Sequence, residues 1–115
     1  MKAVVLSFVI AALAACGSSG PPSCPNDLPA SCPSPAPSYQ GMIAPLISAR
    51  CLICHSPGGQ EASIPFTTYQ NVFAERSPML DQVYACYMPP TGAQPLSAQE
   101  RNQLLTWLVC GAPNN

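Results

Sequence analysis

Apolar residues recur every three or four positions in four stretches beyond residue 38, which is the spacing of a helix with one buried face. No stretch there alternates in the way that a half-buried strand does. Pro45 limits the first helix to a start near Met42, because proline is tolerated only in the first turn. The pattern therefore predicts an all-α domain of roughly three to five short helices. The apolar positions are Met42, Ile43, Leu46 and Ile47; Tyr69, Val72 and Phe73; Met79, Leu80, Val83 and Tyr84; and Leu104, Leu105 and Leu108.

Capping signals support three of these helices. Residues 97–100 read Ser-Ala-Gln-Glu, a full capping box, and Gly111 supplies a left-handed stop after the last apolar position. Residues 67–70 read Thr-Thr-Tyr-Gln, a similar box for the second helix. Ser77 followed by Pro78 predicts the N-cap and first residue of the third. The resulting core is thin for a domain of this size, so we expect some other group to fill its centre.

The beginning of the chain has a different pattern. Met1-Lys2 and a thirteen-residue apolar run, AVVLSFVIAALAA, have the length of a signal-peptide core and are too short to span a bilayer. Residues 13–16 read Leu-Ala-Ala-Cys, which resembles the lipobox of bacterial lipoproteins. The resemblance implies cleavage before Cys16 and a lipid on its sulfur. An ordinary signal peptide, with cleavage after an Ala-x-Ala site and a normal thiol at Cys16, is the alternative.

Residues 17–38 contain seven prolines and little apolar surface. Such a segment cannot form helix or sheet ladders, and in extended form it reaches on the order of 60 Å. We therefore expect three parts. Residues 1–15 are a lipoprotein signal peptide, residues 16–38 a lipidated cysteine with a proline-rich tether, and residues 39–115 the folded domain.

The charge and the cysteine content exclude one class of protein and indicate the cellular compartment. Four basic residues in the whole chain cannot form the basic patch of a nucleic-acid-binding protein. Seven cysteines in 115 residues are more than a reducing cytosol would leave as free thiols, which indicates an oxidising compartment. With the leader, this predicts a protein on the periplasmic side of the bacterial cell envelope, lipid-anchored to a membrane and monomeric.

Residues 51–55 read Cys-Leu-Ile-Cys-His and contain the single histidine of the chain. C-x-x-C-H is the attachment signature of haem c, in which Cys51 and Cys54 form thioethers and His55 binds the iron. Three alternatives use the same residues. They are a thioredoxin-like pair, which would need a βαβ context, a plain disulfide between Cys51 and Cys54, and a zinc site. The zinc site would use Cys51, Cys54, Cys86 and Cys110.

Met88 is the candidate for the second axial iron ligand. It precedes Pro89 and Pro90, which stiffen the backbone just after the thioether. Met42 and Met79 lie on apolar helix faces, where a core role is the simpler interpretation.

The C-x-x-C-H element, the Met-Pro-Pro element and a C-terminal amphipathic helix together resemble a small monohaem bacterial cytochrome c of class I. The resemblance implies a helical fold around one covalent haem c, with His55 and Met88 on the iron. Many members place a Gly-Pro after the histidine to accept its ring N–H, and here only Pro57 lies nearby, so that partner of His55 stays open. The expected walls of the haem pocket are Phe66, Tyr69, Phe73, Tyr84 and Trp107.

With Cys16 assigned to lipid and two cysteines to haem, four remain, and these allow three pairings. We favour Cys24–Cys32, which closes a short local loop in the tether, and Cys86–Cys110, which ties the Met88 loop to the end of the last helix.

The leading hypothesis is a non-enzymatic electron carrier with redox partner proteins in the envelope. The alternatives are a haem enzyme or gas sensor with an open sixth position, or a non-haem, disulfide-stapled surface lipoprotein that binds another protein.

Overall fold

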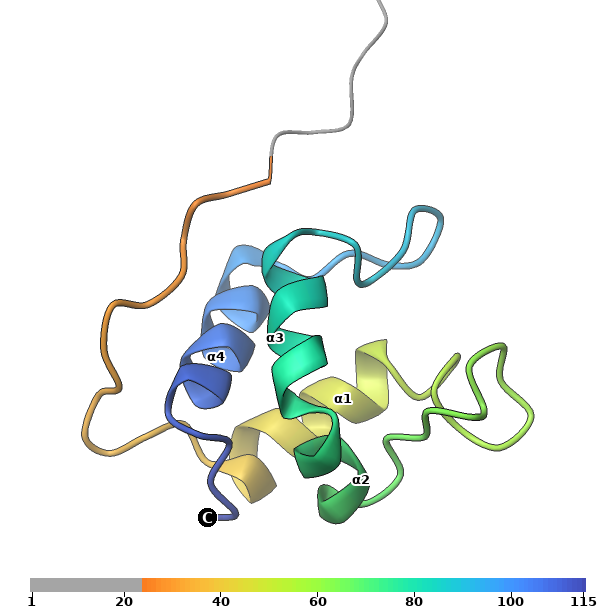
Figure 1. The fold of residues 1–115 in the computed structure, drawn as a ribbon, viewed down its shortest axis with the longest axis horizontal. Helices are drawn as coiled ribbons and strands as arrows, with labels where there is room; N and C mark the ends of the chain where they lie inside the picture. Colours follow the sequence, from red (N-terminus) through yellow and green to blue (C-terminus); the bar gives the residue numbers. More distant parts are fainter. Residues whose placement is uncertain (1–23) are drawn as a thin grey trace, which may run out of the picture.

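The computed structural model describes residues 24–115, which form helices and contain no strand (Figure 1). The predicted all-α class is therefore confirmed for this part of the chain. α3 and α4 pack side by side, and α1 crosses below them (Figure 1). The elements are a π-helix η1 (Tyr39–Ile43), followed by α1 (Ala44–Arg50), α2 (Tyr69–Ala74), α3 (Arg76–Tyr84) and α4 (Ala98–Val109).

The first helical stretch begins at a polar cap and continues through proline. The Ser38 hydroxyl accepts a hydrogen bond from the Gly41 N–H at the start of η1. Pro45 lies at the second position of α1, where its missing N–H has no helical partner to lose. Ile43, Leu46 and Ile47 are buried, as their spacing predicts.

α4 has both of its predicted ends. The Ser97 hydroxyl accepts from the Glu100 N–H at 3.1 Å, and a Glu100 carboxylate oxygen accepts from the Ser97 N–H at 2.8 Å. Gly111 has φ +82°, the left-handed conformation that glycine adopts without steric cost. The capping box and the stop are thus confirmed.

Ser97→Ala is expected to lower the free energy of unfolding by about 1 kcal/mol, because the Glu100 N–H loses its partner. Chemical denaturation followed by circular dichroism measures this loss. Ser63→Ala, in an exposed loop, is the matched control and should leave stability unchanged. Equal effects of the two substitutions would contradict the role of the cap.

α2 and α3 begin at residues other than those predicted. The N-cap of α2 is Thr68, whose hydroxyl accepts from the Asn71 N–H, so the cap lies one residue later than the predicted Thr67. The predicted N-cap at Ser77 is wrong, because α3 begins at Arg76 and Glu75 serves both helices. With no linker between the helices, α3 starts early. Pro78 still lies in its first turn, where proline is tolerated.

The core lies between η1, α1, α3 and α4, with Val72 contributed by α2. Trp107 is fully buried, and its ring centroid lies 5.6 Å from that of Tyr39. Its indole N–H donates to the Pro113 carbonyl at 2.9 Å, which ties the C-terminal residues to the core. The Tyr69 hydroxyl donates to the Ala112 carbonyl at 2.9 Å. The C-terminal residues therefore belong to the packed structure.

Two disulfides join the N-terminal segment, residues 24–38, to the helices. They are Cys24–Cys86, just after α3, and Cys32–Cys110, at the end of α4. The predicted pairing of Cys24 with Cys32 and of Cys86 with Cys110 is wrong. Its premise was a short local loop, whereas the segment runs along the outside of α4 and meets the two ends of that helix (Figure 1).

The predicted signal peptide and the lipidation site at Cys16 lie outside the described residues. The boundaries at residues 15 and 38 remain predictions. None of the helices within residues 24–115 has the length and hydropathy that a membrane crossing requires.

Candidate functional site

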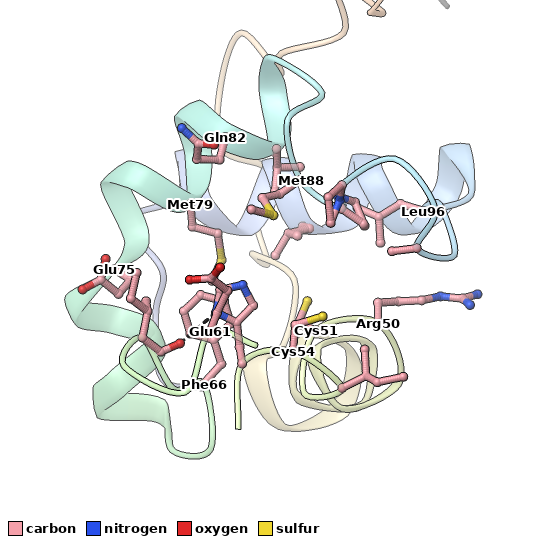
Figure 2. A pocket seen from close by; sticks show the side chains of 18 of the residues that line it. Arg50, Cys51, Cys54, Glu61, Phe66, Glu75, Met79, Gln82, Met88 and Leu96 are labelled. Atoms are coloured by element: carbon pink, nitrogen blue, oxygen red, sulfur yellow. Dashed lines mark hydrogen bonds between the residues drawn. The ribbon is translucent and has the colours of Figure 1, made fainter. Parts of the chain in front are cut away.

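An apolar cavity of about 520 Å³ lies beside the helices (Figure 2). Three parts of the chain line it: the segment 50–66 after α1, one face of α3, and the loop 88–96. Val83 and Leu104, both buried in the core, also line it. The cavity is thus a hollow that continues the core toward the surface.

The Cys51–His55 stretch forms a tight turn at the C-terminal end of α1. The Cys51 carbonyl accepts from the N–H groups of Cys54 and His55, at 3.1 and 2.9 Å. Gly59 then passes over this turn so closely that a Cβ there would lie 2.2 Å from the Cys54 carbonyl oxygen. A glycine is therefore required at position 59 for the turn to hold its shape.

The His55 ring has one partner that the sequence did not indicate. Its Nδ1–H donates to the Ile64 carbonyl at 2.8 Å, which in the neutral ring leaves Nε2 as the acceptor. The ring also stacks on Phe66, with centroids 4.2 Å apart and planes 16° apart. Ile64, rather than Pro57, is therefore the partner of the ring N–H. No local signal marks it, because it lies nine residues away across a loop.

Met88 lies across the cavity from the two cysteines (Figure 2). Its N–H donates to the Gln82 carbonyl at 3.0 Å, which fastens it to the end of α3. Met79, predicted as a core residue, is buried and also lines the cavity. The structure thus brings Cys51, Cys54, His55 and Met88 together around one space. Of the five aromatic residues expected on its wall, only Phe66 lines it.

Both cysteines of the turn are free thiols. Burial raises the pKa of the Cys51 thiol to about 11, and the neighbouring Cys54 adds to this rise. Cys51 is therefore a neutral thiol at physiological pH. It also lies at a helix C-terminus, where the helix dipole disfavours a thiolate.

Three charged residues, Arg50, Glu61 and Glu75, are among those that line the cavity. Arg50 pairs with Glu100 at 2.9 Å, so its charge is matched outside the cavity. Glu61 is exposed, and Glu75 is half-buried between α2 and α3. The lining is nevertheless mostly apolar and offers mainly carbon and sulfur atoms to a ligand.

The expectation that another group must fill the core was a main physical support for haem. In the structure, two disulfides over long loops supply the staples that a small core needs. They also occupy Cys86 and Cys110, so the four-cysteine zinc site does not form. The βαβ context of a thioredoxin-like pair is absent from residues 24–115.

Comparison of the chain with protein-family models, with curated proteins and with solved structures found no match. Residues 24–115 contain no group of three or more histidine, cysteine, aspartate or glutamate side chains that could hold a metal ion. On these findings we correct the identification as a class I cytochrome c. Covalent haem c, its iron ligation and the electron-carrier assignment are withdrawn with it. What the structure shows is a small helical protein stapled by two disulfides, with two free thiols beside an apolar cavity.

Proposed function

We propose that this protein is a non-haem, lipid-anchored envelope lipoprotein whose stapled helical domain binds a small, uncharged apolar molecule. The observation that carries the proposal is the apolar cavity of about 520 Å³, a volume within the usual range of small-molecule sites. The protein acts by binding and performs no acid–base catalysis in this role.

The chemistry of the wall selects the ligand class. Met79, Met88 and Phe66 offer polarisable, apolar contacts that adapt to a ligand's shape. The nearest guanidinium, that of Arg50, is already paired with Glu100. An anionic ligand would therefore lose water without gaining an unpaired cation, and a neutral one is preferred.

The anchor and the disulfides would place this cavity close to a membrane. If Cys16 carries the lipid, Cys24 lies eight positions after it, and this stretch spans at most about 30 Å. The tether would then be about half as long as the sequence alone suggests. Such a tether favours ligands that enter from, or leave to, the bilayer.

The neutral fluorophore N-phenyl-1-naphthylamine tests the cavity. The chain from residue 17 onward, exported so that both disulfides form, should bind it saturably. Ala93→Trp places an indole in the cavity and should weaken binding about tenfold or more. Ala62→Trp, exposed and outside the cavity, is the matched control and should change binding less than about twofold.

Two results would contradict the proposal. One is a fluorescence titration without saturation. The other is an intact mass above that of the polypeptide, carried by Cys51 and Cys54, which would mean that the cavity already holds a covalently attached prosthetic group. The mass measurement should therefore come first.

A partner protein is the second candidate. Ile53, which is 81% exposed, and Ile64, which is 38% exposed, both line the cavity. An apolar side chain of a partner could cover both and enter the same space. Ile53→Asp would then abolish capture of the partner while leaving fluorophore binding intact.

A further inference from the structure

Among residues 24–115, Cys51 and Cys54 are the cysteines that remain as thiols, while the other four form two disulfides. The proposed binding function uses these two thiols only as apolar wall. Their chemistry in an oxidising compartment is therefore unaccounted for.

The geometry brings the two thiols within reach of each other. The hydrogen bond from the Cys54 N–H to the Cys51 carbonyl closes a four-residue turn, which holds the two Cα atoms less than about 7 Å apart. A disulfide requires a Cα separation of about 4.4–6.8 Å. Both sulfur atoms also lie together on the same wall of the cavity (Figure 2).

We propose that Cys51 and Cys54 form a reversible thiol–disulfide couple that reduces disulfides of envelope proteins. This activity goes beyond ligand binding and does not depend on it. The reducing partner that restores the dithiol is another dithiol protein of the envelope.

The surroundings assign different roles to the two sulfurs. Cys54 lines the apolar cavity and also a second, shallow depression formed with Gly59 and Gly92. Cys51 lines the apolar cavity alone. A large substrate can therefore approach Cys54 from the second side, so Cys54 is the attacking thiol and Cys51 the resolving one.

The reaction proceeds in two exchanges. The Cys54 thiolate attacks one sulfur of the substrate disulfide, the substrate S–S bond breaks, and the other substrate sulfur leaves as a thiolate. The Cys51 thiol then gives up its proton as its sulfur attacks Cys54 Sγ, which breaks the mixed disulfide and releases the second substrate sulfur as a thiolate. The two protons lost by Cys51 and Cys54 end on the two substrate thiols, so two electrons pass from the protein to the substrate.

The position of the pair sets the direction of transfer. Oxidising couples stabilise a thiolate, often at a helix N-terminus. Here the pair follows the C-terminal end of α1, and the cavity interior contains no unpaired cation. The dithiol form gains no such stabilisation, and the couple is therefore a reductant rather than an oxidant.

The test uses the full chain, exported in a bacterial host and equilibrated in mixtures of reduced and oxidised dithiothreitol. After acid quenching and thiol alkylation, trypsin releases residues 51–76, a peptide that contains these two cysteines and no others. We expect one transition in which both thiols disappear together and the peptide loses two hydrogens. The peptides holding Cys24, Cys32, Cys86 and Cys110 should stay unchanged through that transition.

Two single variants test the assigned roles. With glutathione disulfide as the probe, Cys51→Ser should accumulate a mixed disulfide at Cys54 at least about tenfold faster than Cys54→Ser does at Cys51. Equal rates would overturn the roles. Thiols that persist in fully oxidised buffer, or a peptide that carries another covalent mass, would overturn the couple itself. Fluorophore binding, measured on the same samples, reports separately on the cavity.

Discussion

Replacing Cys32 and Cys110 together by serine is expected to lower the free energy of unfolding by about 4 kcal/mol. The bond joins residues 78 positions apart, so its loss frees a long loop in the unfolded chain. It also releases segment 24–38 from the end of α4, close to where Tyr39 packs on Trp107. Few small domains have much stability beyond this amount, so the variant should be partly unfolded at 37 °C.

Urea denaturation followed by far-UV circular dichroism measures this effect. The variant with serine at Cys24 and Cys86 is the natural comparison, because its bond spans 62 positions and loop entropy changes slowly with length. The two double variants should therefore lose similar amounts of stability. A loss below about 1 kcal/mol in either would show that the bond contributes little to the fold.

Arg101→Met is expected to lower the free energy of unfolding by about 3 kcal/mol, the second-largest effect that we expect. Arg101 is 8% exposed and donates to the backbone carbonyls of Val83 and Tyr84. It also pairs with Asp27 at 2.8 Å, which links α4 to segment 24–38. Methionine keeps much of the aliphatic stem and removes every donor, so the loss reports on the guanidinium. Asp27 is about one-third exposed, and its share of the loss is the smaller one.

Arg50→Met is the matched control. Its pair with Glu100 is also an Arg–carboxylate contact, whereas Arg101 donates in addition to a buried backbone carbonyl, so we expect a loss below about 1 kcal/mol for Arg50→Met. Similar losses for the two arginines would contradict a special role for Arg101.

Lowering the pH should reduce the difference in the free energy of unfolding between the wild-type protein and Arg101→Met. The hydrogen bond from Arg101 holds the pKa of Asp27 below its usual value. The pair therefore stabilises the fold fully above the pKa of an unfolded aspartate, about 3.9, and loses this contribution as pH falls through the folded-state pKa. The variant lacks that contribution at every pH. Urea denaturation of both proteins at pH 7 and pH 3 should show a smaller difference in their free energies of unfolding at pH 3.

The site was predictable as a set of residues but not as an arrangement. Cys51, Cys54 and His55 form a unit because their spacing places them in one turn, and Met88 was singled out by the prolines after it. Those four do line one cavity. The chemistry assigned to them rested on a resemblance that no matching family supports, and residues 24–115 hold no group of three or more metal-binding side chains.

The helix ends were predictable where contacts within a single turn of the chain determine them. The capping box at Ser97 and the stop at Gly111 are satisfied by contacts within a few residues, so the amino-acid order is sufficient to find them. The start of α3 was missed because Glu75 ends one helix and begins the next. No local pattern distinguishes this arrangement from a helix that begins at Ser77.

By itself, the amino-acid sequence determined the helical class, the burial of Ile43, Leu46 and Ile47, and the turn that holds the two thiols, because each depends on side chains within one or two helical turns. Only the tertiary structure decided which cysteines pair, what Arg101 binds and which carbonyl orients His55. Except for the His55 contact across its loop, these partners lie far apart along the chain. Their meeting depends on the path of segment 24–38 and the loops, which no local spacing encodes.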